Sequence, residues 1–148
     1  MTSRSLERST VLAATPDAVW AAIGDFGAPA GWHPHLPPCT LEDGGDPEVP
    51  GTVRVFTLDG RTVARERLLH SDAGSRSYRY TLLDPVVLPV HDYVATLAVR
   101  PHPEGAEVTW SAAYRSADDV VPRVEALFGD GTYDTGLAAL RARFTSSR

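Results

Sequence analysis

Hydrophobic residues recur at strand spacing in the middle of the chain and at helical spacing towards both ends. Between residues 52 and 115, segments rich in Val, Thr, Tyr and Leu are separated by short runs of Gly, Pro and Asp, which is typical of β-strands joined by turns. This pattern predicts strands over residues 52–58, 63–71, 76–83, 93–100 and 106–115. Because strands joined by short turns pair antiparallel, we expect these segments to form an antiparallel sheet.

Helices are predicted before and after this strand-rich segment of the chain. A short strand over residues 6–13 is followed by Thr15, Pro16 and Asp17. Thr caps a helix, Pro suits its first turn and Asp complements its positive end, so a short helix is expected to begin at Pro16. Towards the C-terminus, two apolar helical stripes are out of phase, and Gly-Asp-Gly at residues 129–131 lies between them. We therefore expect one long C-terminal helix with a kink or bulge at this point.

The length of 148 residues suits a single domain with a sizeable core. The predicted elements give an α+β fold in which a curved antiparallel sheet packs against the long C-terminal helix, with a space between them that is either filled core or a ligand cavity. We expect the domain to span residues 1–148, with flexible tails at residues 1–5 and 145–148.

Composition narrows the function classes. The net charge of −5 disfavours binding to nucleic acid or to an anionic membrane surface. All 14 basic residues are Arg, so a Schiff-base lysine and a phosphate-binding loop lysine are excluded. The absence of Lys, Asn and Gln is typical of a GC-rich bacterial coding region.

Targeting signals are not evident in the sequence. Cys39 is the single cysteine, which excludes an intramolecular disulfide. No apolar run reaches the roughly 18 residues of a membrane-spanning helix, so we expect no membrane insertion. The first five residues lack the apolar segment of a secretory signal, and a cytoplasmic location is therefore expected.

Several short motifs follow one another in a characteristic order. They are Trp20, Asp25-Phe26-Gly27, Trp32-His33-Pro34, Gly51 with Arg54, Glu66-Arg67-Leu68, Leu88-Pro89-Val90 with Tyr93, and Trp110. Together they resemble the bacterial polyketide cyclase/dehydrase-like branch of the START/Bet v 1 (SRPBCC) superfamily, over nearly the whole chain. The resemblance implies a helix-grip fold, with a seven-stranded curved antiparallel sheet wrapped round a long C-terminal helix and two short helices after the first strand. It also implies a hydrophobic cavity and no metal.

Glu66 is the most informative polar residue, because it shares a strand face with apolar neighbours. If residues 58–60 form a three-residue hairpin loop, Arg54 lies on the same face and can form a buried pair with Glu66. A two-residue Asp59-Gly60 turn would send Arg54 to the other face. The pair is either structural or functional, and in the second case Glu66 serves as general acid/base or as a ligand anchor.

Aromatic residues alternate with small ones on the predicted inner face. Tyr93 shares its face with Ala95, and Trp110 shares its face with Ala112, which leaves room beside the rings. Aromatic stripes are more often core than pocket, but together with the resemblance they favour a cavity. The expected ligand-binding residues are Trp32, His33, Phe56, Glu66, Tyr80, Tyr93, Trp110 and Phe128. The ligand is expected to enter past the loops over residues 32–38 and 86–90.

A metal site is an alternative use for the histidines. His33 and His35, joined by His70 or His91, would supply nitrogen ligands, but His-Pro-His is not a standard zinc pattern and no Cys completes it. We therefore expect no metal and no cofactor. Cys39 is interpreted as a small buried hydrophobic residue rather than a reactive thiol.

Three functions remain open. The first is binding of a small hydrophobic molecule, whether aromatic, polyketide-like or lipid-like. The second is a polyketide cyclase or dehydratase type of enzyme, with Glu66 as general acid/base and Arg54, Tyr80 and Tyr93 as donors to an enolate. The third is a ligand-dependent protein-interaction module that uses residues 84–90, and either a protein partner or a homodimer is compatible with the sequence. No nucleic-acid partner is expected.

Overall fold

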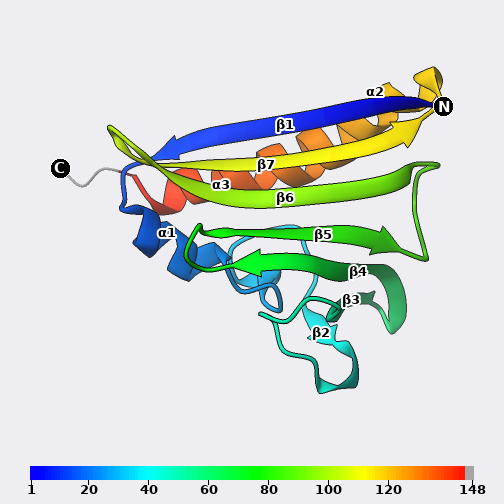
Figure 1. Ribbon diagram of the computed structural model, residues 1–148, viewed down its shortest axis with the longest axis horizontal. Coiled ribbons are helices and arrows are strands. Elements are labelled where there is room, and N and C mark those ends of the chain that lie inside the picture. Colours follow the sequence, from blue (N-terminus) through cyan, green and yellow to red (C-terminus); the bar gives the residue numbers. More distant parts are fainter. Residues whose placement is uncertain (146–148) are drawn as a thin grey trace.

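Seven strands form one antiparallel sheet that curves round the C-terminal helix (Figure 1). The structure is a computed structural model and describes residues 1–145. The strand order across the sheet is β1-β7-β6-β5-β4-β3-β2. The strands are β1 (Thr2–Leu12), β2 (Cys39–Leu41), β3 (Val53–Leu58), β4 (Arg61–Asp72), β5 (Ser77–Leu83), β6 (His91–His102) and β7 (Gly105–Ser116). The α+β helix-grip prediction is confirmed.

The first helix, α1 (Pro16–Ile23), begins where its signals predict. The Oγ1 atom of Thr15 accepts a hydrogen bond of 3.2 Å from the backbone N–H of Ala18, which satisfies one of the free donors at the helix start. The second short helix expected after the first strand is a single 3-10 turn, η1 (Pro29–Gly31). A further 3-10 turn, η2 (Glu42–Gly44), follows β2.

The C-terminal helix is continuous but changes its winding in the middle. It starts with η3 (Asp118–Val120) and α2 (Val121–Val124), widens into a π-helix, η4 (Glu125–Asp134), and ends with α3 (Thr135–Arg143). The π-helix contains residues 129–131, so the predicted bulge is confirmed. It also accounts for the two apolar stripes being out of phase, because a wider turn shifts the helical period.

The N-terminal tail prediction is wrong, because β1 starts at Thr2 and pairs along its whole length with β7. Thr2 lies opposite Ser116, and Ser5 lies opposite Ala113. The Arg4 side chain forms an ion pair with Asp118 at the start of the C-terminal helix. Polar residues at every position from 2 to 5 hid the strand pattern, since neither face of this stretch is apolar. Of the expected C-terminal tail, residues 146–148 lie outside the described residues.

The core lies between the inner face of the sheet and the C-terminal helix. Leu97 on β6, Val108 on β7 and Leu140 on α3 are fully buried. Packing is tightest at Gly136, where an added Cβ atom would lie 2.6 Å from Cδ2 of His33 and 3.0 Å from Cζ3 of Trp32. Only glycine permits this approach. Within residues 1–145, no helix is both long and apolar enough to cross a membrane.

Candidate functional site

The turn between β3 and β4 sets which side chains face the helix. Asp59 and Gly60 both have positive φ angles, of 52° and 76°, and Leu58 pairs with Arg61. This is a two-residue hairpin turn of the kind that matches strand twist, so the predicted three-residue loop is wrong. By itself the shorter turn would turn Arg54 away from the helix side.

A β-bulge restores the register. The pairing of β3 with β4 shifts between Phe56 and Thr57, which leaves Val63 as an extra residue on β4. One extra residue reverses the alternation of faces, so Arg54 lies directly opposite Glu66. The predicted pairing of Arg54 with Glu66 is therefore confirmed, although the loop on which it depended is different.

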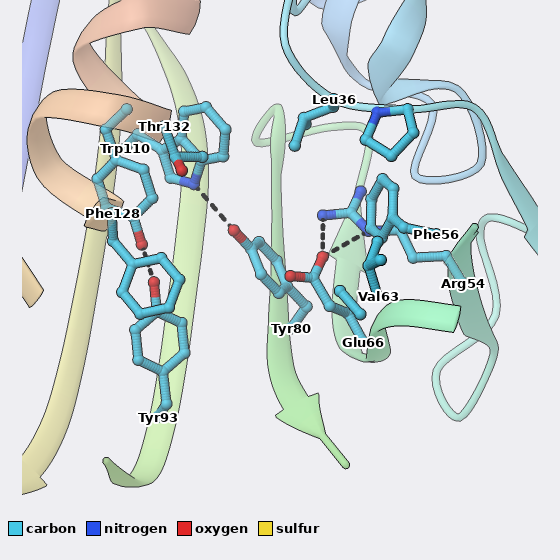
Figure 2. A pocket seen from close by; sticks show the side chains of 13 residues that line it. Leu36, Arg54, Phe56, Val63, Glu66, Tyr80, Tyr93, Trp110, Phe128 and Thr132 are labelled. Atoms are coloured by element: carbon cyan, nitrogen blue, oxygen red, sulfur yellow. Dashed lines mark hydrogen bonds and ion pairs between the residues drawn. The ribbon is translucent and has the colours of Figure 1, made fainter. Parts of the chain in front are cut away.

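The Arg54–Glu66 ion pair uses only one oxygen of the carboxylate. The Nε and Nη2 atoms of Arg54 lie 2.8 Å and 2.7 Å from Oε1 of Glu66. Among residues 1–145, no hydrogen-bond partner is found for the second oxygen, Oε2. Figure 2 shows this oxygen turned away from the guanidinium, on the side of Tyr80. The pair thus leaves one carboxylate oxygen free to accept a hydrogen bond.

Arg54 is enclosed by backbone and aromatic rings. Its Nη1 atom donates to the carbonyl of Phe26 at 3.0 Å and to the hydroxyl of Tyr78 at 3.4 Å. Its Cζ atom lies 4.2 Å from the ring centroid of Phe26 and 4.7 Å from that of Tyr80. Burial alone would lower the pKa of Arg54, but the Glu66 carboxylate and the surrounding groups more than offset this, and the pKa lies above its usual range. Arg54 is a fixed cation.

A cavity of about 150 Å³ lies beside this pair, between β3, β4, β5, the β6–β7 strands and the π-helix (Figure 2). Its lining residues are Leu36, Pro37, Arg54, Phe56, Val63, Ala64, Glu66, Tyr80, Tyr93, Trp110, Phe128, Thr132 and Tyr133. The deep residues such as Phe56 and Trp110 are buried, whereas Leu36, Phe128 and Val63 are partly exposed. This difference in exposure places the mouth of the cavity near Leu36, Val63 and Phe128.

Three tyrosines supply further polar atoms of the cavity wall. The indole N–H of Trp110 donates to the hydroxyl of Tyr80 at 3.1 Å, and the hydroxyls of Tyr93 and Tyr133 bond to each other (Figure 2). Burial raises the pKa of Tyr80, Tyr93 and Tyr133 well above the usual range of tyrosine. These phenols remain protonated at neutral pH and act as hydrogen-bond donors and acceptors, not as bases.

Six of the eight expected ligand-binding residues line the cavity, namely Phe56, Glu66, Tyr80, Tyr93, Trp110 and Phe128. Trp32 and His33 are not among the lining residues, so the structure does not bring these two predicted residues to the cavity. Both are buried, at 7% and 2% exposed, and they pack against the helix at Gly136. The ring of Trp32 lies 5.5 Å from that of Trp110, so the tryptophan supports the cavity wall from behind.

The environment of His33 explains why it is structural. Its Nε2 atom lies 2.7 Å from the carbonyl oxygen of Thr132, and its Nδ1 atom accepts the backbone N–H of His35 at 3.1 Å. The proton therefore sits on Nε2, and both nitrogens are occupied. Burial lowers the pKa of His33. Across the described part of the chain, no cluster of three His, Cys, Asp or Glu side chains is placed to hold a metal ion.

The lining residues that the sequence did not single out come from the bulge, the loop before β2 and the π-helix. They are Leu36, Pro37, Val63, Ala64, Thr132 and Tyr133. Leu36 and Pro37 lie within the predicted entrance loop. The other predicted entrance, residues 86–90, does not line the cavity, since Leu88 is buried in the core and Val87 is exposed.

Cys39 is half-buried and its Sγ atom lies 3.2 Å from the carbonyl oxygen of Gly27. Burial raises the pKa of its thiol, so the thiolate is disfavoured.

Comparison with solved structures places the chain among proteins of the same fold. A solution NMR structure from Thermobifida fusca is 34% identical, with a TM-score of 0.87 over 95% of this chain and 92% of the other. A structure from Nitrosospira multiformis is 25% identical, with a TM-score of 0.78 and 97% of each chain covered.

A more distant structure shares the fold alone. Norcoclaurine synthase from Thalictrum flavum, solved with dopamine and hydroxybenzaldehyde, is 19% identical, with a TM-score of 0.70 over 99% of this chain and 90% of that one. No curated protein matches the chain. The family model for polyketide cyclase/dehydrase and lipid transport proteins matches residues 3–145, and the chain belongs to that family, within the SRPBCC superfamily that its motifs indicate.

Proposed function

We propose that the protein binds a small, mainly apolar molecule in the cavity between the sheet and the C-terminal helix. The observation that carries this proposal is the cavity itself, whose walls are aromatic and aliphatic and which contains Oε2 of Glu66, an oxygen without a hydrogen-bond partner among residues 1–145. Apolar pockets with a few well-placed polar groups are the usual form of small-molecule sites. The position of the π-helix at the site supports the same assignment, because such local widening recurs at functional sites.

The cavity volume favours the smallest of the expected ligands. A dry apolar cavity of about 150 Å³ holds a molecule the size of benzene, whereas sites for drug-sized ligands span roughly 300–1,000 Å³. At about 150 Å³, this cavity suits a molecule with a single ring. A multi-ring polyketide or a long acyl chain requires the mouth near Leu36, Val63 and Phe128 to widen.

The walls are built to keep their shape. Trp110 stacks on Tyr133 with ring centroids 4.5 Å apart and planes 17° apart. Tyr93 bonds to Tyr133, and Trp110 bonds to Tyr80, so rings from three strands and the helix hold one another. A preformed wall lowers the entropy that is lost on binding.

A cyclase or dehydratase activity is a second candidate, and the free oxygen of Glu66 favours it. A carboxylate oxygen at an apolar cavity can remove an acidic proton between two carbonyl groups, and the Tyr80 hydroxyl can donate to the resulting enolate. Arg54 is a poor candidate for that donor role, because four of its five N–H bonds are directed to Glu66, the Phe26 carbonyl and Tyr78. Arg54 is better described as a positioning residue for Glu66.

Native mass spectrometry tests the binding proposal. The purified protein is incubated with a panel of single-ring aromatic, polyketide-like and lipid-like molecules, beside the variant Ala64→Leu, whose larger side chain occupies the cavity. We expect a single-ring adduct on the native protein and a much weaker one on the variant. If the folded native protein retains no compound of any class, the proposal is wrong. A released compound with a changed mass would instead favour the enzyme.

A further inference from the structure

We propose that Glu66 selects ligands that carry a hydroxyl group. The cavity then accepts a neutral single-ring alcohol or phenol and rejects carboxylates. This inference rests on the proposed binding function and names the chemical class of the ligand. It follows from three features of the cavity: the free oxygen of Glu66, the enclosure of Arg54, and the state of the tyrosine hydroxyls.

The free oxygen of Glu66 creates a demand for a hydrogen-bond donor. Arg54 contacts Oε1 of Glu66 but not Oε2. Its two contacts, of 2.8 Å and 2.7 Å, therefore leave Oε2 available to a ligand in the cavity. The Glu66 side chain is only 13% exposed, and Oε2 is not among the fully buried atoms, so this oxygen is accessible through the cavity. A ligand that displaces water from this oxygen without donating to it leaves a costly unpaired acceptor, whereas a ligand that donates to it replaces the lost hydrogen bond.

The enclosure of Arg54 makes the cavity unsuitable for an anion. Among the described residues that line the cavity, Arg54 carries the only cation, and the rings of Phe26 and Tyr80 lie 4.2 Å and 4.7 Å from its Cζ atom. A ligand carboxylate in the cavity would therefore meet Oε2 of Glu66 before it met the cation. Two carboxylates in an apolar site repel each other and both lose hydration. Fatty acids and aromatic acids are excluded for this reason.

The tyrosine hydroxyls provide the complementary group. Tyr80 accepts the indole N–H of Trp110, and its hydroxyl lies on the cavity wall with those of Tyr93 and Tyr133. A ligand hydroxyl group can donate to Oε2 of Glu66 and still accept a hydrogen bond on its own oxygen, so it suits a wall that carries a carboxylate beside tyrosine hydroxyls. A hydrocarbon can do neither, and an ether cannot donate. An ammonium group would add a net charge to a cavity in which Arg54 and Glu66 already balance each other.

Isothermal titration of the native protein with four ligands of similar size tests this inference. The ligands are phenol, anisole, toluene and benzoate. We expect phenol to bind about tenfold or more tightly than anisole and toluene, because its O–H donates to a charged acceptor. Benzoate is expected to bind at least about tenfold more weakly than toluene. The change of Glu66 to Gln keeps the shape and removes the charge, so it should reduce the advantage of phenol and restore part of the benzoate binding.

The outcomes separate the two proposals. If toluene, anisole and phenol bind with equal affinity, the cavity binds rings but Glu66 does not select them, and this inference is overturned. If benzoate binds most tightly, it is also overturned. If none of the four binds, this inference is overturned as well, and the panel of polyketide-like and lipid-like compounds then decides whether the binding function stands. Should Glu66→Gln not fold, as judged by circular dichroism, the four-ligand series on the native protein still decides the matter.

Discussion

Two adjacent stretches of the C-terminal helix pack differently against the sheet: one is in close contact with aromatic side chains, and the other borders a cavity. At Gly136 on α3, Trp32 and His33 approach so closely that a single added carbon atom would clash. Around Phe128 and Thr132 on the π-helix, a cavity of about 150 Å³ separates the helix from β3 and β4. Because the two stretches belong to one helix over one sheet, the cavity is a local feature and not a sign of loose packing.

The difference arises from what stands opposite each stretch. Gly136 has no side chain, so aromatic rings fill the space up to the helix backbone. Opposite the π-helix stand Arg54 and Glu66, whose charges are satisfied by each other and by Phe26. Filling that space with an apolar side chain would remove the remaining access of Glu66 to solvent or ligand. The space is therefore left open where the Arg54–Glu66 pair lies opposite the helix, and it is filled where Gly136 allows aromatic rings to reach the helix backbone.

The largest expected effect comes from breaking the charged pair. Glu66→Leu leaves the guanidinium of Arg54 buried without its counter-ion, which is expected to cost about 3–5 kcal/mol of unfolding free energy. Urea denaturation followed by tryptophan fluorescence measures the change. The double variant Arg54→Met with Glu66→Leu removes both charges and should recover most of the loss. A loss below about 1 kcal/mol in Glu66→Leu would show that Arg54 is not dependent on this partner.

A smaller effect is expected from adding a methyl group to the closely packed stretch. In Gly136→Ala the new Cβ would meet His33, Trp32 and Trp110 at 2.6, 3.0 and 3.1 Å. Overpacking of this kind costs typically about 1–3 kcal/mol, and the better helix propensity of Ala returns up to about 1 kcal/mol. We expect a net loss of stability in thermal unfolding. An unchanged or raised Tm would mean that the two stretches are packed alike.

The matched change at the cavity is Ala64→Leu on β4, which faces the π-helix stretch across the cavity. Its side chain extends into the cavity rather than into packed atoms, so the unfolding free energy should change by less than about 1.5 kcal/mol. Ligand affinity should nevertheless fall at least about tenfold. Strong destabilisation with unchanged binding would place the empty space somewhere else.

The smallest effect concerns pH and the closely packed stretch. Burial lowers the pKa of His33 in the folded state relative to about 6.5 in the unfolded chain, so the unfolded state takes up its proton first as pH falls. The stability that depends on neutral His33 is fully present above about pH 6.5 and declines as pH falls below that value. In His33→Gln, an amide that can still donate to the carbonyl of Thr132, the part of the decline due to His33 should disappear. Denaturation series at several pH values compare the two proteins.

The sequence predicted the elements better than the details that shape the site. Capping residues located α1, strand periodicity located β3 to β7, and Gly-Asp-Gly located the helix bulge, because each depends on local conformational preferences. The pairing of Arg54 with Glu66 was predicted from a three-residue loop, whereas the structure reaches it through a two-residue turn and a bulge at Val63. A bulge is set by packing across the sheet and leaves no clear local signal.

The burial of His33 and Trp32 could not be predicted from the sequence for a similar reason. Their contacts with Gly136 and Thr132 join residues about 100 positions apart in the chain. The role of Tyr133 depends on the π-helix, which brings it to the same side as Phe128, five residues earlier. Six of the eight predicted ligand-binding residues were nevertheless placed at the cavity, because alternation along a strand fixes its inner face.

The most direct test of the account is a crystal structure of the protein with 4-bromophenol, in which the anomalous signal of bromine locates the ring. We expect one strong bromine peak inside the cavity, with the phenol oxygen within hydrogen-bond distance of Oε2 of Glu66. A fully occupied ring elsewhere on the molecule, with the cavity between Glu66, Tyr80 and Phe128 empty, would contradict it.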